Sequence, residues 1–207
     1  MRLTRRLAVL GMTLTLVATL TACAADTEPA PETAAEESTS APTSEAADET
    51  QHNDADTQFA QMMIVHHEGA IEMADLAVAN AATEDVRSLA ERITGAQGPE
   101  IELMTSWLKA WGEELPSDAD MSPMDHGSME MDGMDQETAM AELSGLSGTE
   151  FDRRFLELMT DHHRGAIEMA EEHRGGGENT AAIEMSGKII DAQTAEITEM
   201  ANLMQRL

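Results

Sequence analysis

The chain has 207 residues, of which 40 are Asp or Glu and 12 are Lys or Arg, so its formal net charge at pH 7 is −28. This charge argues against nucleic acid as a partner, because a protein that binds phosphate backbones needs a basic surface. The single cysteine excludes internal disulfides and thiolate metal clusters, whereas 17 methionines supply thioether sulfur.

The first 23 residues have the pattern of a bacterial lipoprotein signal peptide. Three arginines precede an apolar stretch from Leu7 to Leu20, and the sequence LTAC ends at Cys23. The stretch is short for a membrane span, and small residues before the cysteine suit a peptidase that leaves it as the lipid-bearing first residue. We therefore predict an extracytoplasmic protein, lipid-anchored to the bacterial cell membrane through Cys23. An uncleaved anchor helix is the alternative.

Residues 24–53 are rich in Ala, Glu, Thr, Ser and Pro, and almost none of them could contribute to a core. This composition favours a disordered acidic tether. Removal of the signal peptide leaves nine basic residues against 40 acidic ones, so the formal charge of the mature chain is −31. We interpret this charge as a solvated surface that also attracts cations in general.

The remaining residues, 54–207, contain one unit twice at a constant offset of 96 residues. The sequence FAQMMIVHHEGAIEMAD, which starts at Phe59, matches FLELMTDHHRGAIEMAE, which starts at Phe155. The same offset continues without a gap: AQ at 96–97 matches AQ at 192–193, and EI at 100–101 matches EI at 196–197. Each half is therefore one structural unit of two segments.

The segments have helical periodicity. Apolar and histidine side chains in the first segment recur every three or four residues and lie on one helix face: Phe59, Met63, His66, Ala70, Met73 and Ala77. We predict an all-α fold, a four-helix bundle of two duplicated hairpins at 54–112 and 148–207, joined by a Met-rich linker at 113–147. Thr83 or Thr180 is expected to cap the helix that follows each hairpin turn.

The pattern D..F...M..HH.GAIEMA followed by AQ..EI..M occurs twice behind a lipoprotein signal. This arrangement resembles the family called domain of unknown function 305, over residues 54–207. The resemblance implies a ferritin-like four-helix bundle that is often secreted or lipid-anchored. For some members it also implies copper binding and copper tolerance.

Helix geometry, independently of the family resemblance, places candidate metal ligands close to each His-His pair. A methionine three residues before each pair lies within one helical turn of it, and antiparallel pairing brings a second methionine from the partner helix to the same level. Each hairpin is therefore expected to close its own site. The candidate ligands are Met63, His66, His67, Met73 and Met104 in the first hairpin, and Met159, His162, His163, Met169 and Met200 in the second. For Met73 and Met169, a role as core filler is equally open.

Thioether and neutral imidazole, without thiolate, suit Cu(I) better than Zn(II), Mg(II) or Ca(II), with Ag(I) as a chemical mimic. Copper, as Cu(I), is therefore the predicted cofactor. Glu100 and Glu196 are expected to orient an imidazole through its other nitrogen rather than bind the metal.

Between the hairpins, a polar segment is unusually rich in methionine. Because flexible polar sequence gains little from methionine as packing material, we interpret these side chains as mobile thioethers for a soft cation, with oxidation sensing as a lesser alternative. The candidate ligands in this segment are Met121, Met124, His126, Met129, Met131 and Met134.

Three classes of function remain open. The first is a non-enzymatic lipoprotein that buffers, stores or transfers Cu(I), and this is the function we predict. The second is a ferritin-like metalloenzyme such as an oxidase, although di-iron bundles use Glu-x-x-His pairs and the four helices contain none. The third is a metal-free structural bundle whose histidines are hydrogen-bonded core residues.

Overall fold

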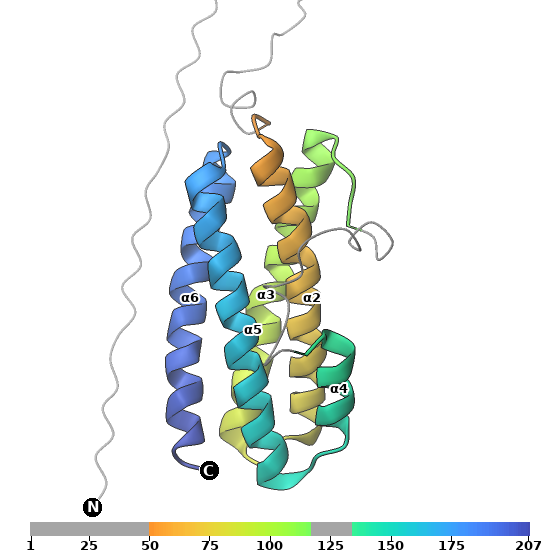
Figure 1. Ribbon diagram of the computed structural model, residues 1–207, viewed down its shortest axis with the longest axis vertical. Helices are drawn as coiled ribbons and strands as arrows, with labels where there is room; N and C mark the ends of the chain where they lie inside the picture. Colours follow the sequence, from red (N-terminus) through yellow and green to blue (C-terminus); the bar gives the residue numbers. More distant parts are fainter. Residues whose placement is uncertain (1–49, 117–133) are drawn as a thin grey trace, which may run out of the picture. The chain divides into compact units, whose positions relative to one another are not determined.

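The structure is a computed structural model that describes residues 50–116 and 134–207. Within these ranges the chain is helical, and Figure 1 shows four long helices side by side with one short helix at their edge. The elements are α2 (Asp54–Asn80), α3 (Glu84–Trp111), α4 (Gln136–Ser144), α5 (Gly148–Gly176) and α6 (Thr180–Met204). The predicted all-α four-helix bundle of two hairpins is confirmed.

The two hairpins, α2 with α3 and α5 with α6, meet mainly through α2 and α5. These two helices run in opposite directions (Figure 1). Because the halves are sequence repeats and their first helices are antiparallel, a twofold pseudo-axis passes between α2 and α5, across the bundle. Equivalent residues 96 positions apart are therefore exchanged by this axis.

Two parts of the chain are more ordered than the sequence indicated. Residues 50–53, which we assigned to the tether, contact the bundle: Asn53 caps α2, and the side-chain amide of Asn179 donates to the carbonyl of Gln51 at 2.8 Å. The predicted linker contains α4, which packs against α2 and α5 and buries Ala139 and Leu143. Because most residues of this nine-residue helix are polar or small, its sequence lacks a clear apolar periodicity that would predict a helix.

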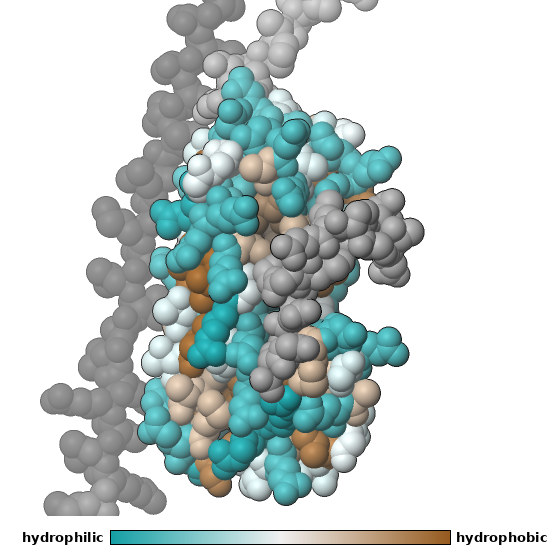
Figure 2. Space-filling model, viewed as in Figure 1, coloured by the Kyte–Doolittle hydropathy of each residue, from teal (hydrophilic) through white to brown (hydrophobic). Residues whose placement is uncertain are grey.

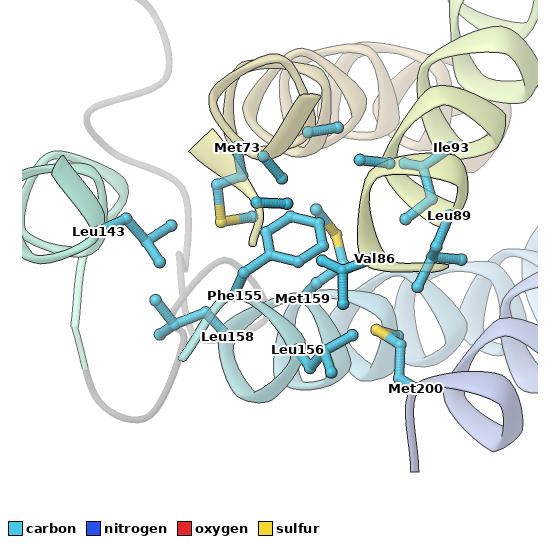
Figure 3. Packing of buried hydrophobic residues seen from close by; sticks show 14 of the residues in the cluster. Met73, Val86, Leu89, Ile93, Leu143, Phe155, Leu156, Leu158, Met159 and Met200 are labelled. Atoms are coloured by element: carbon cyan, nitrogen blue, oxygen red, sulfur yellow. The ribbon is translucent and has the colours of Figure 1, made fainter. Parts of the chain in front are cut away.

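The buried apolar side chains form two clusters, one toward each end of the bundle. We call them the α4-end cluster and the Trp-end cluster. The α4-end cluster includes Met73, Val86, Leu89, Ile93, Phe155, Leu156, Met159 and Met200 (Figure 3). The Trp-end cluster includes Phe59, Met63, Ile64, Met104, Leu108, Met169, Met185 and Ile189, with Trp107 and Trp111 packed against it. Neither cluster contains the four repeat histidines, which lie between Met63 and Met73 in α2 and between Met159 and Met169 in α5.

Each hairpin turn is held by a carboxylate from the other hairpin. Asp152 in α5 accepts hydrogen bonds from the backbone N–H groups of Ala82 at 2.8 Å and Thr83 at 2.9 Å, just before α3. Asp56 in α2 accepts from the N–H groups of the equivalent residues, Glu178 at 3.0 Å and Asn179 at 3.1 Å, just before α6. The two hairpins are thus clasped together at both ends of the bundle.

Of the two predicted threonine caps, Thr83 is at the N-cap position and Thr180 is not. Thr83 is the N-cap of α3, as predicted, but its side chain makes no capping hydrogen bond, and the carboxylate of Asp152 instead accepts its backbone N–H. For α6 the N-cap is Asn179, whose side-chain oxygen accepts from Ala182 N–H at 3.0 Å, and Thr180 is the first helical residue.

Most of the face in Figure 2 is hydrophilic, with narrow apolar strips near α6. This surface matches the large excess of acidic side chains in the sequence. No helix in the described ranges combines the length and hydropathy that a membrane span needs.

Candidate metal centre

The four repeat histidines form one buried layer between α2 and α5. His66 and His67 lie in α2, His162 and His163 lie in α5, and none exposes more than 3% of its surface. Because the pseudo-axis exchanges His66 with His162 and His67 with His163, the antiparallel docking of two identical motifs brings both pairs to the same level. We call these four residues the histidine layer.

His66 and His162 meet face to face across the interface between the hairpins. Their ring centroids are 3.7 Å apart and their planes are inclined by 27°. In addition, Nε2 of His162 lies 2.9 Å from the backbone carbonyl oxygen of His66, to which it donates. One histidine of each pair therefore faces the other hairpin, and the expectation that each hairpin closes a site of its own stays a prediction.

His67 and His163 are held by a glutamate from the second helix of their own hairpin. Nε2 of His67 is 2.8 Å from Oε2 of Glu100, and Nε2 of His163 is 2.6 Å from Oε2 of Glu196. The imidazoles are buried, whereas the two glutamate side chains retain 25% and 20% exposure, so each carboxylate keeps contact with solvent. These contacts are the ones expected of glutamates that orient imidazoles; orientation of a metal-bound imidazole stays a prediction.

The hydrogen bonds fix which ring nitrogen carries the proton. A nitrogen that donates to a carboxylate or a carbonyl is protonated, so the other nitrogen of a neutral imidazole has a lone pair. In His67, His162 and His163 that atom is Nδ1, and in all three it is buried without a hydrogen-bond partner. The side-chain amide of Gln97 and the Oε1 atom of Gln193, also buried, have none either.

Such a concentration of unpaired polar atoms is costly, because each buried donor or acceptor without a partner loses about 1–3 kcal/mol of solvation. Native proteins keep them where a bound ion, a water molecule or a catalytic step uses them. The donor chemistry here, several imidazole lone pairs with methionine sulfur on either side, fits a soft metal ion.

Burial also controls the charge of His162. Burial lowers the pKa of His162 to about 3; the hydrogen bond to the His66 carbonyl opposes this effect, and the proximity of His163 and His67 adds to it. His162 is therefore neutral in the pH range in which proteins normally function, and a neutral imidazole is the form that binds metal.

The methionines are arranged around the layer by the pseudo-axis rather than by hairpin. The Trp-end cluster contains Met63 and Met104 together with Met169 from the other hairpin. The α4-end cluster contains the equivalent set, Met159 and Met200 together with Met73 (Figure 3). Met63 and Met104 share a cluster, as antiparallel pairing within the hairpin predicted, whereas Met73 and Met169 each lie in a cluster with methionines of the other hairpin. A role of any of these methionines in metal binding stays a prediction.

The described residues contain no group of three or more His, Cys, Asp or Glu side chains that could hold a metal ion. Met134, the only described methionine of the Met-rich segment, is partly buried against the α4-end cluster. The other candidates of that segment and the lipid-bearing cysteine lie outside the described residues: Cys23, Met121, Met124, His126, Met129 and Met131.

A second polar cluster was not predicted. Nε2 of His173 is 2.8 Å from Oδ1 of Asp56, and its Nδ1 is 2.6 Å from the hydroxyl oxygen of Ser186. Burial raises the pKa of Asp56, but the hydrogen bonds from His173 and from the N–H groups of Asn53, Glu178 and Asn179 outweigh burial and lower it. The only available sequence signal was that Asp56 recurs as Asp152, since His173 and Ser186 correspond to alanines in the first half.

A family model described as a domain of unknown function (DUF305) matches residues 56–204. The chain belongs to the DUF305 family. No curated protein matches its sequence.

Solved structures of the DUF305 family and its relatives resemble this bundle over most of their length. A DUF305 fragment from Deinococcus radiodurans is 30% identical with a TM-score of 0.66, and the match covers 75% of this chain and 98% of that one. A DUF305 protein from Streptomyces coelicolor, described as secreted, is 32% identical with a TM-score of 0.65, over 73% and 91% of the two chains.

CopM in its Cu(I)-bound form is 30% identical with a TM-score of 0.60, and the match covers 73% of this chain and 96% of CopM. CopM has also been solved in Cu(II)-bound and Ag-bound forms. This DUF305 chain is thus similar, over nearly the whole bundle, to a protein that binds copper.

Proposed function

We propose that this protein is a non-enzymatic, extracytoplasmic lipoprotein that buffers, stores or transfers Cu(I) in copper homeostasis. The observation that carries the proposal is the histidine layer, in which Nδ1 of His67, His162 and His163 is buried and without a hydrogen-bond partner. Similarity to CopM supports copper as the metal. Anchoring through Cys23 rests on the signal-peptide pattern, and the secreted relative from Streptomyces coelicolor supports a location outside the cytoplasm.

Ligand chemistry favours Cu(I) over harder ions. Neutral imidazole and thioether ligands suit a soft monovalent cation that accepts few ligands, whereas Mg(II) and Ca(II) prefer carboxylate and carbonyl oxygen. Glu100 and Glu196 each accept a hydrogen bond from an imidazole N–H through one carboxylate oxygen and face solvent on one side, so they serve as orienting partners and as compensating negative charge.

The alternatives rest on weaker grounds. A di-iron oxidase needs carboxylates that project into the core beside Glu-x-x-His motifs, and the described helices offer histidine paired with half-buried glutamate instead. A metal-free bundle would accept the histidines as structural residues. It would leave unexplained why three Nδ1 atoms, the side-chain amide of Gln97 and the Oε1 atom of Gln193 are buried without a hydrogen-bond partner.

The test is a competition titration with a Cu(I) chelator on the purified chain and on a variant in which His66, His67, His162 and His163 are all leucine. Leucine fills the buried volume and has no donor atom. We expect the variant to lose the tightest Cu(I) component while retaining its helical circular dichroism.

His52→Ala is the matched control, since His52 lies at the bundle end, stacked on Trp111, and should leave Cu(I) affinity unchanged. Equal affinity and stoichiometry in the parent and the quadruple variant would assign the layer a structural role only.

A further inference from the structure

We infer that His52 is a pH-sensitive latch, whose protonated imidazole fastens the chain just before α2 to the end of α3. Residues 50–53, which we call the strap, join the predicted tether to α2. The latch lies at the Trp end of the bundle and outside the histidine layer, so the inference does not rest on the proposed copper function.

The strap touches both hairpins. The start of α2, the end of α3 and the turn between α5 and α6 lie at the same end of the bundle, the upper end in Figure 1. Toward the second hairpin, the side-chain amide of Asn53 donates to the carbonyl of Gly176 at 2.8 Å, and that of Asn179 donates to the carbonyl of Gln51 at 2.8 Å. Toward the end of α3, the contact is made by His52.

Both ring nitrogens of His52 face oxygen atoms that accept hydrogen bonds. Nδ1 is 3.0 Å from the backbone carbonyl oxygen of Thr50, and Nε2 is 3.2 Å from Oε1 of Glu113. A neutral imidazole has one N–H, so it would donate to one of these oxygens and turn a lone pair toward the other. The imidazolium donates to both. The arrangement therefore favours the charged form of His52.

The face of the same ring is placed for a cation–π interaction. The ring centroids of His52 and Trp111 are 4.6 Å apart and the ring planes are inclined by only 6°. Trp111 in turn stacks on Trp107 at 6.0 Å. An indole face attracts a positive charge that lies within about 6 Å of its centre. A carbonyl, a carboxylate and an indole face thus all favour protonation of one imidazole.

The pKa of His52 follows from these contacts. Burial lowers this pKa, but the Thr50 carbonyl, the hydrogen bond and charge of Glu113 and the charge of Asp56 outweigh burial and raise it above the ordinary value of 6.5. Because the pKa is higher in the folded state than in the unfolded state, the latch stabilises the strap fully below about pH 6.5. Its contribution is lost as the pH rises through the folded-state pKa.

The elements around the latch are mostly acidic. The first turn of α2 contains Asp54 and Asp56, and Glu113 and Glu114 follow α3. The turn between α5 and α6 has one charge of each sign, at Arg174 and Glu178. Residues 24–49, which precede the strap, contain acidic residues but no Lys or Arg.

An acidic segment is thus joined to an acidic bundle, and among residues 50–56 only His52 can carry a positive charge. Protonation of His52 offsets the repulsion at this junction. When His52 loses its proton, residues 50–52 lose their attachment to the end of α3, whereas Asn53 still caps α2. The pH around the protein therefore sets how firmly the predicted tether is attached to the bundle.

The first test is a titration of tryptophan fluorescence on the full chain, from about pH 5 to about pH 9. Trp107 and Trp111 are its only tryptophans, and an imidazolium stacked on an indole quenches the emission more than a neutral imidazole does. We expect emission to rise with pH, with a midpoint above 6.5, and we expect His52→Gln to abolish this transition.

Two further variants separate the contact of Glu113 from the general negative charge at this end of the bundle. Glu113→Gln should lower the midpoint of the transition, because it removes the carboxylate that accepts from Nε2 of His52. Glu114→Gln is the matched control, since it removes the same charge from the neighbouring residue and should leave the midpoint near that of the parent.

The second test asks whether the proton holds the strap, by hydrogen exchange at about pH 5.5 and pH 8.5 after correction for the intrinsic rates. The reporter is the backbone N–H of Asn53, which donates to Oδ2 of Asp56 at 2.9 Å. The hydrogen bonds to Asp56 lower its pKa, so this acceptor stays ionised at both pH values. Its protection in the parent should fall about two- to fivefold at the higher pH, the effect of one cation–π contact.

His52→Arg provides the complementary variant, because a guanidinium stays charged at both pH values, donates several hydrogen bonds and stacks on indole. We expect this variant to keep the protection of Asn53 at the higher pH, and His52→Gln to show the lower protection at both. A fluorescence transition that persists in His52→Gln, or equal protection of Asn53 at both pH values in the parent, would overturn the inference.

Discussion

At the scale of single residues, Gly177 is the described glycine at which an added Cβ would have the least space. Its φ is −72°, which any residue adopts, so conformation is not the reason for glycine here. A Cβ at this position would lie 2.8 Å from Oδ1 of Asp56 and even closer to Nε2 of His173. Glycine is therefore required because the buried Asp56–His173 pair passes directly against the turn between α5 and α6.

We expect Gly177→Ala to lower the free energy of unfolding by about 1–3 kcal/mol, since the added methyl group must displace a buried hydrogen-bonded pair. Gly175→Ala is the matched control, because a Cβ there meets nothing within 4 Å and alanine favours the helix. Urea denaturation of both variants makes the comparison. Equal stability for the two would mean that the turn relaxes without disturbing Asp56.

At the scale of elements, the sequence determined the long helices well. The stripe through Phe59, Met63 and His66 predicted α2, and its repeat predicted α5, because burial along one face imposes a spacing of three or four residues. The short helix α4 was missed, since nine residues with only Ala139 and Leu143 buried give little periodic signal.

The candidate site was predicted less completely. Histidine pairs, methionines and the two orienting glutamates could be named from repeat and spacing, because these are properties within one hairpin. How His66 meets His162, and which cluster receives Met73, depend on the docking of α2 against α5, which helical spacing does not specify. The hydrogen bonds from Asp56 and Asp152 to the hairpin turns could not be predicted for the same reason, because they connect one hairpin to the other.

The clasp at Asp152 leads to a prediction about α3. Its carboxylate accepts the N–H groups of Ala82 and Thr83, and Thr83 provides no side-chain cap of its own. Asp152→Ala should therefore destabilise the protein by about 1–2 kcal/mol, as loss of a helix cap does. Hydrogen exchange should accelerate first at the turn between α2 and α3 and at the start of α3. Glu150→Ala, an exposed change two residues away in the same helix, is the control, and equally accelerated exchange in this variant would refute a specific clasp.

At the scale of the whole molecule, the fold uses duplication to place polar groups in an otherwise apolar bundle. Two duplicated hairpins docked antiparallel bring four histidines to one level, with methionine-containing clusters on both sides and a largely hydrophilic surface in the view of Figure 2. A strongly acidic exterior raises the local concentration of cations. In the proposed function, a buried layer of imidazoles flanked by methionine-containing clusters would then select among these cations by softness rather than by charge.

The most direct test of this account is anomalous diffraction at the copper absorption edge from crystals of the full chain loaded with Cu(I). We predict an anomalous peak between α2 and α5, at the level of His66 and His162, with Nδ1 of His67 or His163 among its nearest atoms and methionine sulfur beside it. Crystals of the quadruple leucine variant should lack this peak. Copper bound only at surface carboxylates or along residues 117–133, with no peak in the histidine layer, would contradict the account.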